Sequence, residues 1–245
     1  MAAPKRLVAV AIAAGLSLSA VAGCGSPAKT SASLAARPAK PAKPAKVPMT
    51  TAFVSTNMSI TAGAATSVHV SGFYVWPGIR LTVNIGQQVS GPLAGVMTEF
   101  GVTTSFIGTG GRLYARYDMS VLASFHETAR CPSLCGRYFF LDAKARSGLL
   151  ADMGITGTLS DLQTMADDIS GVTATTYQGR PAFKAVAPLF GRGAYVIVSA
   201  TAQCVPLLFV DPGQFELAFS QWNHVPVPVA PPAADITDLY SQGFS

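Results

Sequence analysis

Apolar and polar residues alternate along several short stretches of this chain, which is the pattern of strands that bury one face. The alternation is clearest at residues 67–75, where SVHVSGFYV places apolar side chains at nearly every second position. Similar stretches follow at residues 80–86, 101–108, 112–118, 171–179, 180–188, 193–200, 205–211 and 214–222. Glycine and proline separate them at intervals of about ten residues, which is typical of successive antiparallel strands.

Two other stretches have the spacing of amphipathic helices. In residues 119–129 the apolar side chains lie three and four positions apart, and Asp118 before them is a suitable N-cap. Residues 159–169 carry an apolar stripe, and Thr158 with Asp161 resembles a capping box at its start. A weaker helical pattern precedes the first strand. We therefore expect an α+β domain with a large, curved antiparallel β-sheet of eight to ten strands and two or three helices.

The amino-acid composition shows that the chain is unusually apolar, but it does not indicate one function. The chain has 245 residues, of which 49% are hydrophobic and 12% are charged, whereas ordinary soluble domains carry about 25% charged residues. After residue 24, no stretch has the roughly 20 consecutive apolar residues of a membrane span. The apolar excess therefore belongs in a core, in a cavity or against a partner.

The net charge of +5 does not indicate nucleic-acid binding. Seven of the 17 Lys and Arg residues precede residue 47, and the rest of the chain has ten of them against twelve Asp and Glu, a net charge of −2. Nucleic-acid-binding domains present a basic surface. We therefore expect no nucleic-acid partner.

The first 24 residues have the layout of a secretion signal. Two basic residues precede an apolar stretch at residues 7–23 that is short for a membrane span. The sequence VAGC that ends at Cys24 resembles the lipobox of bacterial lipoproteins, in which the cysteine thiol receives a diacylglycerol. We expect residues 1–23 to be a lipoprotein signal peptide and the lipidated Cys24 to anchor the protein to the extracytoplasmic face of the cell membrane. An ordinary secretory signal with an incidental cysteine is the alternative.

Residues 24–47 have the composition of a tether. Pro-Ala-Lys occurs three times at residues 38–46, a pattern that favours extended polyproline II over a packed fold. The segment can be a spacer, or its lysines can also contact anionic lipid or a wall polymer. Residues 48–245 are long enough for one domain with a substantial core.

Five stretches of this domain carry a resemblance to a known family. They are SVHVSG at 67–72, the glycine turn before RLYARYD, GRYFFLD at 136–142, YQGRPAFKAV at 177–186 and FSQWNHVPVPVAPPAADITDL at 219–239. In this order they resemble the LppX/LprAFG family of bacterial lipoproteins, which is related in shape to the LolA/LolB lipoprotein carriers. The resemblance covers most of residues 50–240. It implies a half-barrel sheet with helices over its concave face and an apolar cavity that holds acyl chains.

The function implied by this resemblance is that of a lipid-anchored lipoprotein. It would bind or carry an acylated lipid or glycolipid as a monomer. The expected cavity lining includes Phe106, Leu122, Phe125, Leu162 and Met165. The same five side chains can equally form a packed core, because sequence does not distinguish a cavity wall from an interior. In that case the domain would be a structural or interaction module of the cell surface.

Residues suited to catalysis are few. His69, His126 and His224 lack metal-ligand spacing, and the sequence has neither a G-x-S-x-G elbow nor a phosphate-binding loop. Asp167 and Asp168 are adjacent on a predicted helix, so their side chains point in different directions. We expect no enzyme, no metal and no cofactor. A hydrolytic activity would require distant residues to converge in the fold.

Three cysteines follow Cys24, and an extracytoplasmic location permits disulfides. Cys131 and Cys135 flank a short loop with one proline and form the preferred candidate pair. A bond between one of them and Cys204, or three reduced thiols, stays open at this point.

Overall fold

The computed structural model describes residues 47–76, 79–141 and 155–237. These residues belong to one compact unit that spans Ala45–Ser245. The predicted signal peptide, the predicted lipidation site Cys24 and residues 24–46 of the predicted tether lie outside the described residues.

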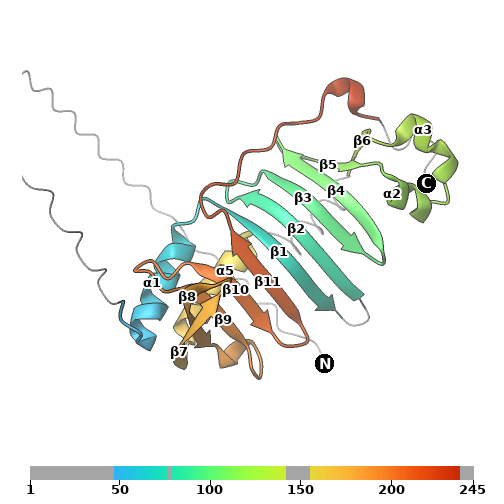
Figure 1. The fold of residues 1–245 in the computed structure, drawn as a ribbon. Coiled ribbons are helices and arrows are strands. Elements are labelled where there is room, and N and C mark those ends of the chain that lie inside the picture. Colours follow the sequence, from blue (N-terminus) through green and yellow to red (C-terminus); the bar gives the residue numbers. More distant parts are fainter. Residues whose placement is uncertain (1–46, 77–78, 142–154, 238–245) are drawn as a thin grey trace, which may run out of the picture. The chain divides into compact units, whose positions relative to one another are not determined.

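The described residues contain eleven strands that form one antiparallel sheet (Figure 1). The first group is β1 (Ser67–Trp76), β2 (Ile79–Gln88), β3 (Leu93–Glu99), β4 (Val102–Thr109), β5 (Arg112–Arg116) and β6 (Tyr138–Phe140). The second group is β7 (Gly171–Tyr177), β8 (Arg180–Val186), β9 (Tyr195–Ser199), β10 (Pro206–Asp211) and β11 (Phe215–Ser220). The order β6-β5-β4-β3-β2-β1-β11-β10-β9-β8-β7 joins the two meanders through the β1–β11 pair. The sheet is curved and does not close, as expected.

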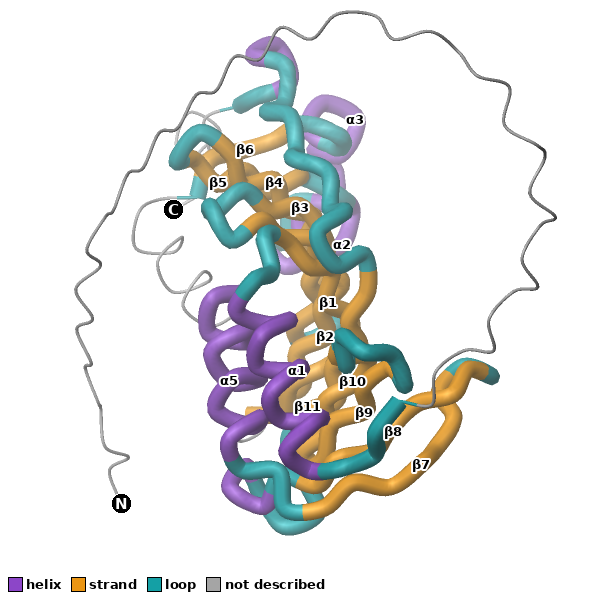
Figure 2. The backbone as a smooth tube through the Cα atoms, turned by 90° about the vertical axis from the view of Figure 1, so that its left-hand side faces the viewer, coloured by secondary structure: helices purple, strands orange, loops and turns teal. Residues whose placement is uncertain are grey.

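Four α-helices lie in the described part of the chain: α1 (Thr51–Gly63), α2 (Met119–Ser124), α3 (Cys131–Leu134) and α5 (Ile155–Asp167). Short 3-10 turns add Thr128–Arg130, Pro188–Phe190 and Ala233–Asp235. The helices α1 and α5 lie side by side along the sheet, and α2 and α3 lie at the end formed by β4–β6 (Figures 1 and 2). Asp118 caps α2, as predicted, by accepting a hydrogen bond from the Val121 N–H at 2.9 Å.

The strand register assigns each side chain to one face of the sheet, because neighbours along a strand alternate between faces. Even positions of β1 and odd positions of β2, β3 and β11 face α1 and α5; Val70, for example, pairs with Ile85 and Phe219. This concave face and the helices share one hydrophobic core, which contains Met58 of α1 and Leu162 of α5. We call the opposite side the outer face.

Glycine allows adjacent strands to approach closely on the concave face. A Cβ atom on Gly72, whose φ is +147°, would lie 1.9 Å from the carbonyl oxygen of Glu216 in β11. On Gly95 in β3 it would lie 2.3 Å from the carbonyl oxygen of Asn84 in β2. Side chains there would push the strands apart, so these two glycines permit the bending of the sheet.

The structure differs from the predicted elements in three places. Strand β3 (Leu93–Glu99) and the short strand β6 raise the count above the expected eight to ten. The helix predicted for residues 119–129 ends at Ser124, and His126 has a left-handed φ of 60°. Helix α5 begins at Ile155, before the predicted capping box, so Thr158 lies inside the helix.

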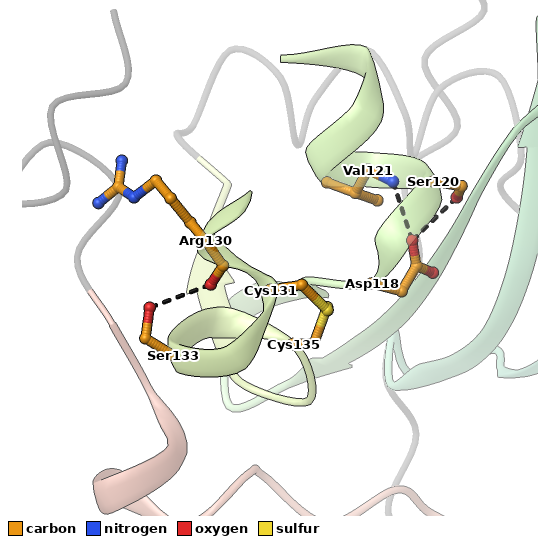
Figure 3. The surroundings of a disulfide bond; sticks show 7 residues. All are labelled: Asp118, Ser120, Val121, Arg130, Cys131, Ser133 and Cys135. Atoms are coloured by element: carbon orange, nitrogen blue, oxygen red, sulfur yellow. Dashed lines mark hydrogen bonds between the residues drawn. A yellow bond between two sulfur atoms is a disulfide. The ribbon is translucent and has the colours of Figure 1, made fainter. Parts of the chain in front are cut away.

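A disulfide joins Cys131 to Cys135, with a Cα–Cα distance of 4.7 Å (Figure 3). It closes the single turn of α3, and the Cys135 N–H also donates a hydrogen bond to the Cys131 carbonyl oxygen at 2.9 Å. Cys204 is a free, buried thiol. Of the pairings that the sequence left open, the structure therefore contains the 131–135 bond.

Candidate functional site

The five side chains predicted to line a cavity occupy different environments. Leu122, Leu162 and Met165 are 0% exposed and Phe106 is 4% exposed, so all four lie within the packed core between the sheet and the helices. Phe125, which follows α2, is 42% exposed. The structure therefore brings four of the five into one apolar layer and leaves Phe125 at its edge.

Part of the concave face keeps some accessible surface. Its central apolar residues are only partly buried, in contrast to their fully buried neighbours: Val70, Tyr74, Met97, Val102 and Phe215. Geometry explains why. Eleven strands spaced about 4.8 Å apart span roughly 50 Å, whereas two packed helices, each about 10 Å wide, cover roughly 20 Å. The described helices therefore leave apolar surface uncovered in the middle of the sheet.

One polar group interrupts this apolar surface. The Tyr74 hydroxyl of β1 forms a hydrogen bond with Thr158 of α5, and Asp161 lies close enough to interact electrostatically. Burial raises the pKa of the Tyr74 phenol above its usual value, while the hydrogen bond with Thr158 opposes that rise. Burial also raises the pKa of the Asp161 carboxyl. A ligand on the concave face would meet hydrogen-bonding groups here and hydrocarbon elsewhere.

A pocket of about 650 Å³ opens beside Ser71, Ala218 and Ser220, whose strand positions face the outer side of the sheet. Its walls come from the β7–β8 turn, the end of β9, the start of β10 and the end of β11, with one residue from β1. The apolar lining includes Leu207, Ala218 and Trp222, and Arg180 is the only charged side chain among the described residues that line it. A volume of this size lies within the range of small-molecule sites. None of the five predicted lining residues borders this pocket.

At the rim of this outer-face pocket, three distant residues converge. The Ser220 hydroxyl, which lines the pocket, lies 3.1 Å from Nδ1 of His69. The other ring nitrogen of His69, Nε2, lies 2.7 Å from Oδ1 of Asn84. The three side chains come from β11, β1 and β2. Because 151 residues separate His69 from Ser220 and 15 separate it from Asn84, no local sequence pattern predicts this arrangement.

The described residues contain no group of three or more His, Cys, Asp and Glu side chains arranged to hold a metal ion. None of their helices combines the length and the hydropathy that a membrane crossing requires.

Comparisons with known proteins give results for structure alone. No protein-family model matches the sequence, and no curated protein matches it. Among solved structures, the chain is similar to two mycobacterial lipoproteins. LprF from Mycobacterium bovis shares 13% identity at a TM-score of 0.49, over 76% of this chain and 99% of LprF. LppX from Mycobacterium tuberculosis shares 16% identity at a TM-score of 0.43, over 72% of this chain and 98% of LppX.

Both matched proteins belong to the family that the sequence resembles.

Proposed function

We propose that this protein is a membrane-anchored, extracytoplasmic lipoprotein that binds or carries an acylated lipid or glycolipid on the concave face of its sheet. Residues 1–23 are the proposed signal peptide, Cys24 is the proposed site of acylation, and residues 24–47 are the proposed tether. Residues 48–245 are the proposed lipid-binding domain, which acts as a monomer. Binding on the concave face involves no enzymatic step.

The observation that supports this proposal is the accessible apolar surface in the middle of the concave face. Val70 and Tyr74 of β1 and Met97 of β3 are partly buried, in contrast to the fully buried core residues beside them. Covering apolar surface with an acyl chain removes both from water, which contributes about 0.8 kcal/mol per buried methylene. Long chains therefore bind such a surface with few directional contacts.

The five predicted lining residues remain part of this proposal. Leu162 and Met165 of α5 have no exposed surface and belong to the core that the helices share with the sheet. An acyl chain that enters between α5 and the sheet would convert these packed side chains into cavity walls. Phe106, Leu122 and Phe125 would extend the same wall toward α2.

Adjacent residues in β3 provide a matched test. Met97 faces the concave side and Val96 faces the outer side, and both are half-buried. A carboxylate in contact with an acyl chain loses hydration without gaining a partner. Met97→Asp should therefore weaken binding of an uncharged fluorescent acyl lipid at least tenfold in a fluorescence titration, whereas Val96→Asp should change the affinity less than about twofold. Equal losses in both variants, with both still folded, would contradict the proposed location.

A second candidate function is a cell-surface interaction module with a filled core. The complete burial of Leu122, Leu162 and Met165 favours it, because packed interiors contain few voids larger than a water molecule. The two candidates differ in one measurable property. An interaction module should bind no acyl lipid, whether residue 97 is Met or Asp. A lipid carrier should bind acyl lipid as the wild-type protein and as Val96→Asp, and should lose this binding in Met97→Asp.

The anchor is tested separately from the ligand. The Cys24 thiol is the proposed attachment point, and two or more acyl chains are needed for stable membrane attachment. Cys24→Ser should move the protein from the membrane fraction into the soluble fraction of its native host, as measured by fractionation and immunoblotting. Retention of the serine variant in the membrane would contradict lipidation at this position.

A further inference from the structure

We propose that Ser220 is a nucleophile that cleaves acyl esters bound in the outer-face pocket, with His69 as its general base and Asn84 as the residue that positions His69. This activity goes beyond lipid binding and uses the opposite face of the sheet. It departs from the sequence-based expectation of a protein without enzymatic activity, because the three residues meet only in the fold.

The hydrogen bonds assign the proton positions on His69. Oδ1 of Asn84 can only accept a hydrogen bond, so Nε2 of the imidazole, 2.7 Å away, carries the proton. In the neutral ring, Nδ1 is then unprotonated and accepts a hydrogen bond from the Ser220 hydroxyl at 3.1 Å. A serine that donates to an imidazole oriented by a third residue has the arrangement of an activated nucleophile.

The sheet holds these three groups in a fixed arrangement. His69 pairs directly with Ser220 across β1 and β11, and the imidazole lies over Gly86 of β2. A Cβ atom at Gly86 would come within 3.8 Å of Cδ2 of His69 and 2.8 Å of Cγ1 of Val225. The absence of a side chain at position 86 therefore leaves space for Val225, while the imidazole lies at ordinary contact distance from this position. Sites built on strands position catalytic groups more accurately than sites on loops.

The pocket beside Ser220 indicates the class of substrate. Leu207, Ala218 and Trp222 supply apolar surface for an acyl chain. The Trp222 N–H already donates to the Pro206 carbonyl oxygen at 3.0 Å, so the indole is held in place. With one cation and several hydroxyl groups in its walls, the pocket suits the carboxylic ester of a short or medium acyl chain.

The residue after Ser220 provides a donor for the oxyanion. Gln221 has a φ of 51°, so the chain turns sharply directly after the nucleophile. Its main-chain N–H has no acceptor among the described residues, and Gln221 also lines the pocket. In serine hydrolases of the nucleophile-elbow type, the N–H that follows the serine stabilises the negative charge on the carbonyl oxygen.

The reaction is a hydrolysis with a covalent intermediate. Oγ of Ser220 bonds to the ester carbonyl carbon while its proton passes to Nδ1 of His69. The bond from that carbon to the alcohol oxygen then breaks, and the alcohol leaves with the proton from His69. Water attacks the acyl-serine and gives its proton to His69. The acid is released and Ser220 regains its proton, with no change of oxidation state.

The test uses a fluorophosphonate probe on the full-length protein, followed by peptide mass spectrometry. We expect the wild-type protein to be labelled at Ser220 and the Ser220→Ala variant to show no label at that position. Loss of the general base in His69→Gln should slow labelling, and the hydrolysis of p-nitrophenyl butyrate, at least about 100-fold. Ser105→Ala is the matched control, because Ser105 of β4 pairs with the outer-facing Val96 and does not line the pocket; this variant should keep the wild-type rate.

Asn84 is tested by rescue. Asn84→Leu removes the acceptor and should slow labelling, whereas Asn84→Asp restores an acceptor and should return most of the rate. Thermal unfolding of each variant shows whether the fold is kept. The proposal is overturned if folded wild-type protein is not labelled at Ser220, or if His69→Gln is labelled at the wild-type rate. Either result would leave the three residues as a polar ladder that only joins strands.

Discussion

The thiol of Cys204 shows how one residue can be fully buried and chemically inert. Its side chain is 0% exposed, and its Sγ lies 3.5 Å from the Thr201 carbonyl oxygen. Burial raises the pKa of the Cys204 thiol to about 11 from an ordinary value of 9.0. Because the thiolate is the reactive form, the folded protein should protect this residue from alkylation at neutral pH.

We therefore predict slow labelling of Cys204 in a Cys24→Ser chain, where it is the one thiol outside the disulfide. Iodoacetamide at pH 8 should modify it in urea within minutes and leave the folded protein unmodified over the same period. Rapid labelling of the folded protein would contradict the buried position. Intact-mass spectrometry provides the readout.

The same pKa shift gives a pH dependence of stability. A thiol whose pKa is higher in the folded than in the unfolded protein stabilises the fold fully below pH 9, and this contribution is lost as the pH rises from 9 to 11. The free energy of unfolding should therefore fall more steeply across this window in the wild-type protein than in Cys204→Ala. The pKa of Tyr74 is also raised, but this residue contributes equally to the pH dependence of the wild-type protein and of Cys204→Ala.

For single residues, the sequence predicted those interactions whose two partners are close together in the chain. Asp118 was recognisable as an N-cap because its acceptor lies three residues before the N–H that it binds. The Cys131–Cys135 pair was recognisable because four residues separate the two thiols. The Ser220–His69 contact was not, since 151 residues separate its members and no local pattern marks it.

Elements of secondary structure were predicted well where alternation was strong. Strand β2 alternates between buried and exposed positions over much of its length, whereas β3 has one buried residue followed by six partly buried ones. Without alternation, the LAGVMTE stretch has no strand signature, and β3 was missed. The start of α5 was misplaced because a threonine followed by an acidic residue also occurs inside helices, where Thr158 instead bonds Tyr74.

Two glycines should respond in opposite directions to alanine substitution. In Gly72→Ala the new Cβ would lie 1.9 Å from the Glu216 carbonyl oxygen, so β1 and β11 would have to separate. We expect a loss of at least about 3 kcal/mol in the free energy of unfolding. Gly157 of α5 has no atom within 4 Å of the corresponding position. Gly157→Ala should therefore stabilise the protein by up to about 1 kcal/mol, measured by urea denaturation.

An equal effect of the two substitutions would contradict the close approach of β1 and β11. This pair is the junction of the two meanders, so it joins the halves of the sheet. A sheet that opens there would lose the continuous concave face on which the proposed function depends.

For the whole domain, the class and the single curved antiparallel sheet followed from strand spacing and from the family resemblance. The pocket on the outer face did not, because it depends on the irregular register between Pro206 and Leu208 and on a turn from another part of the chain. Its existence is a property of the assembled sheet. The accessible apolar surface likewise arises from the width of the sheet relative to the helices, which no single element reveals.

The central claim is that this apolar surface holds an acylated ligand. Native mass spectrometry of the protein purified from its own host tests it most directly, with dissociation and identification of any bound mass. The account predicts wild-type protein that carries an acylated lipid or glycolipid, and Met97→Asp protein that carries none. Wild-type protein that is folded and free of lipid, and that takes up no added acyl lipid, would contradict it.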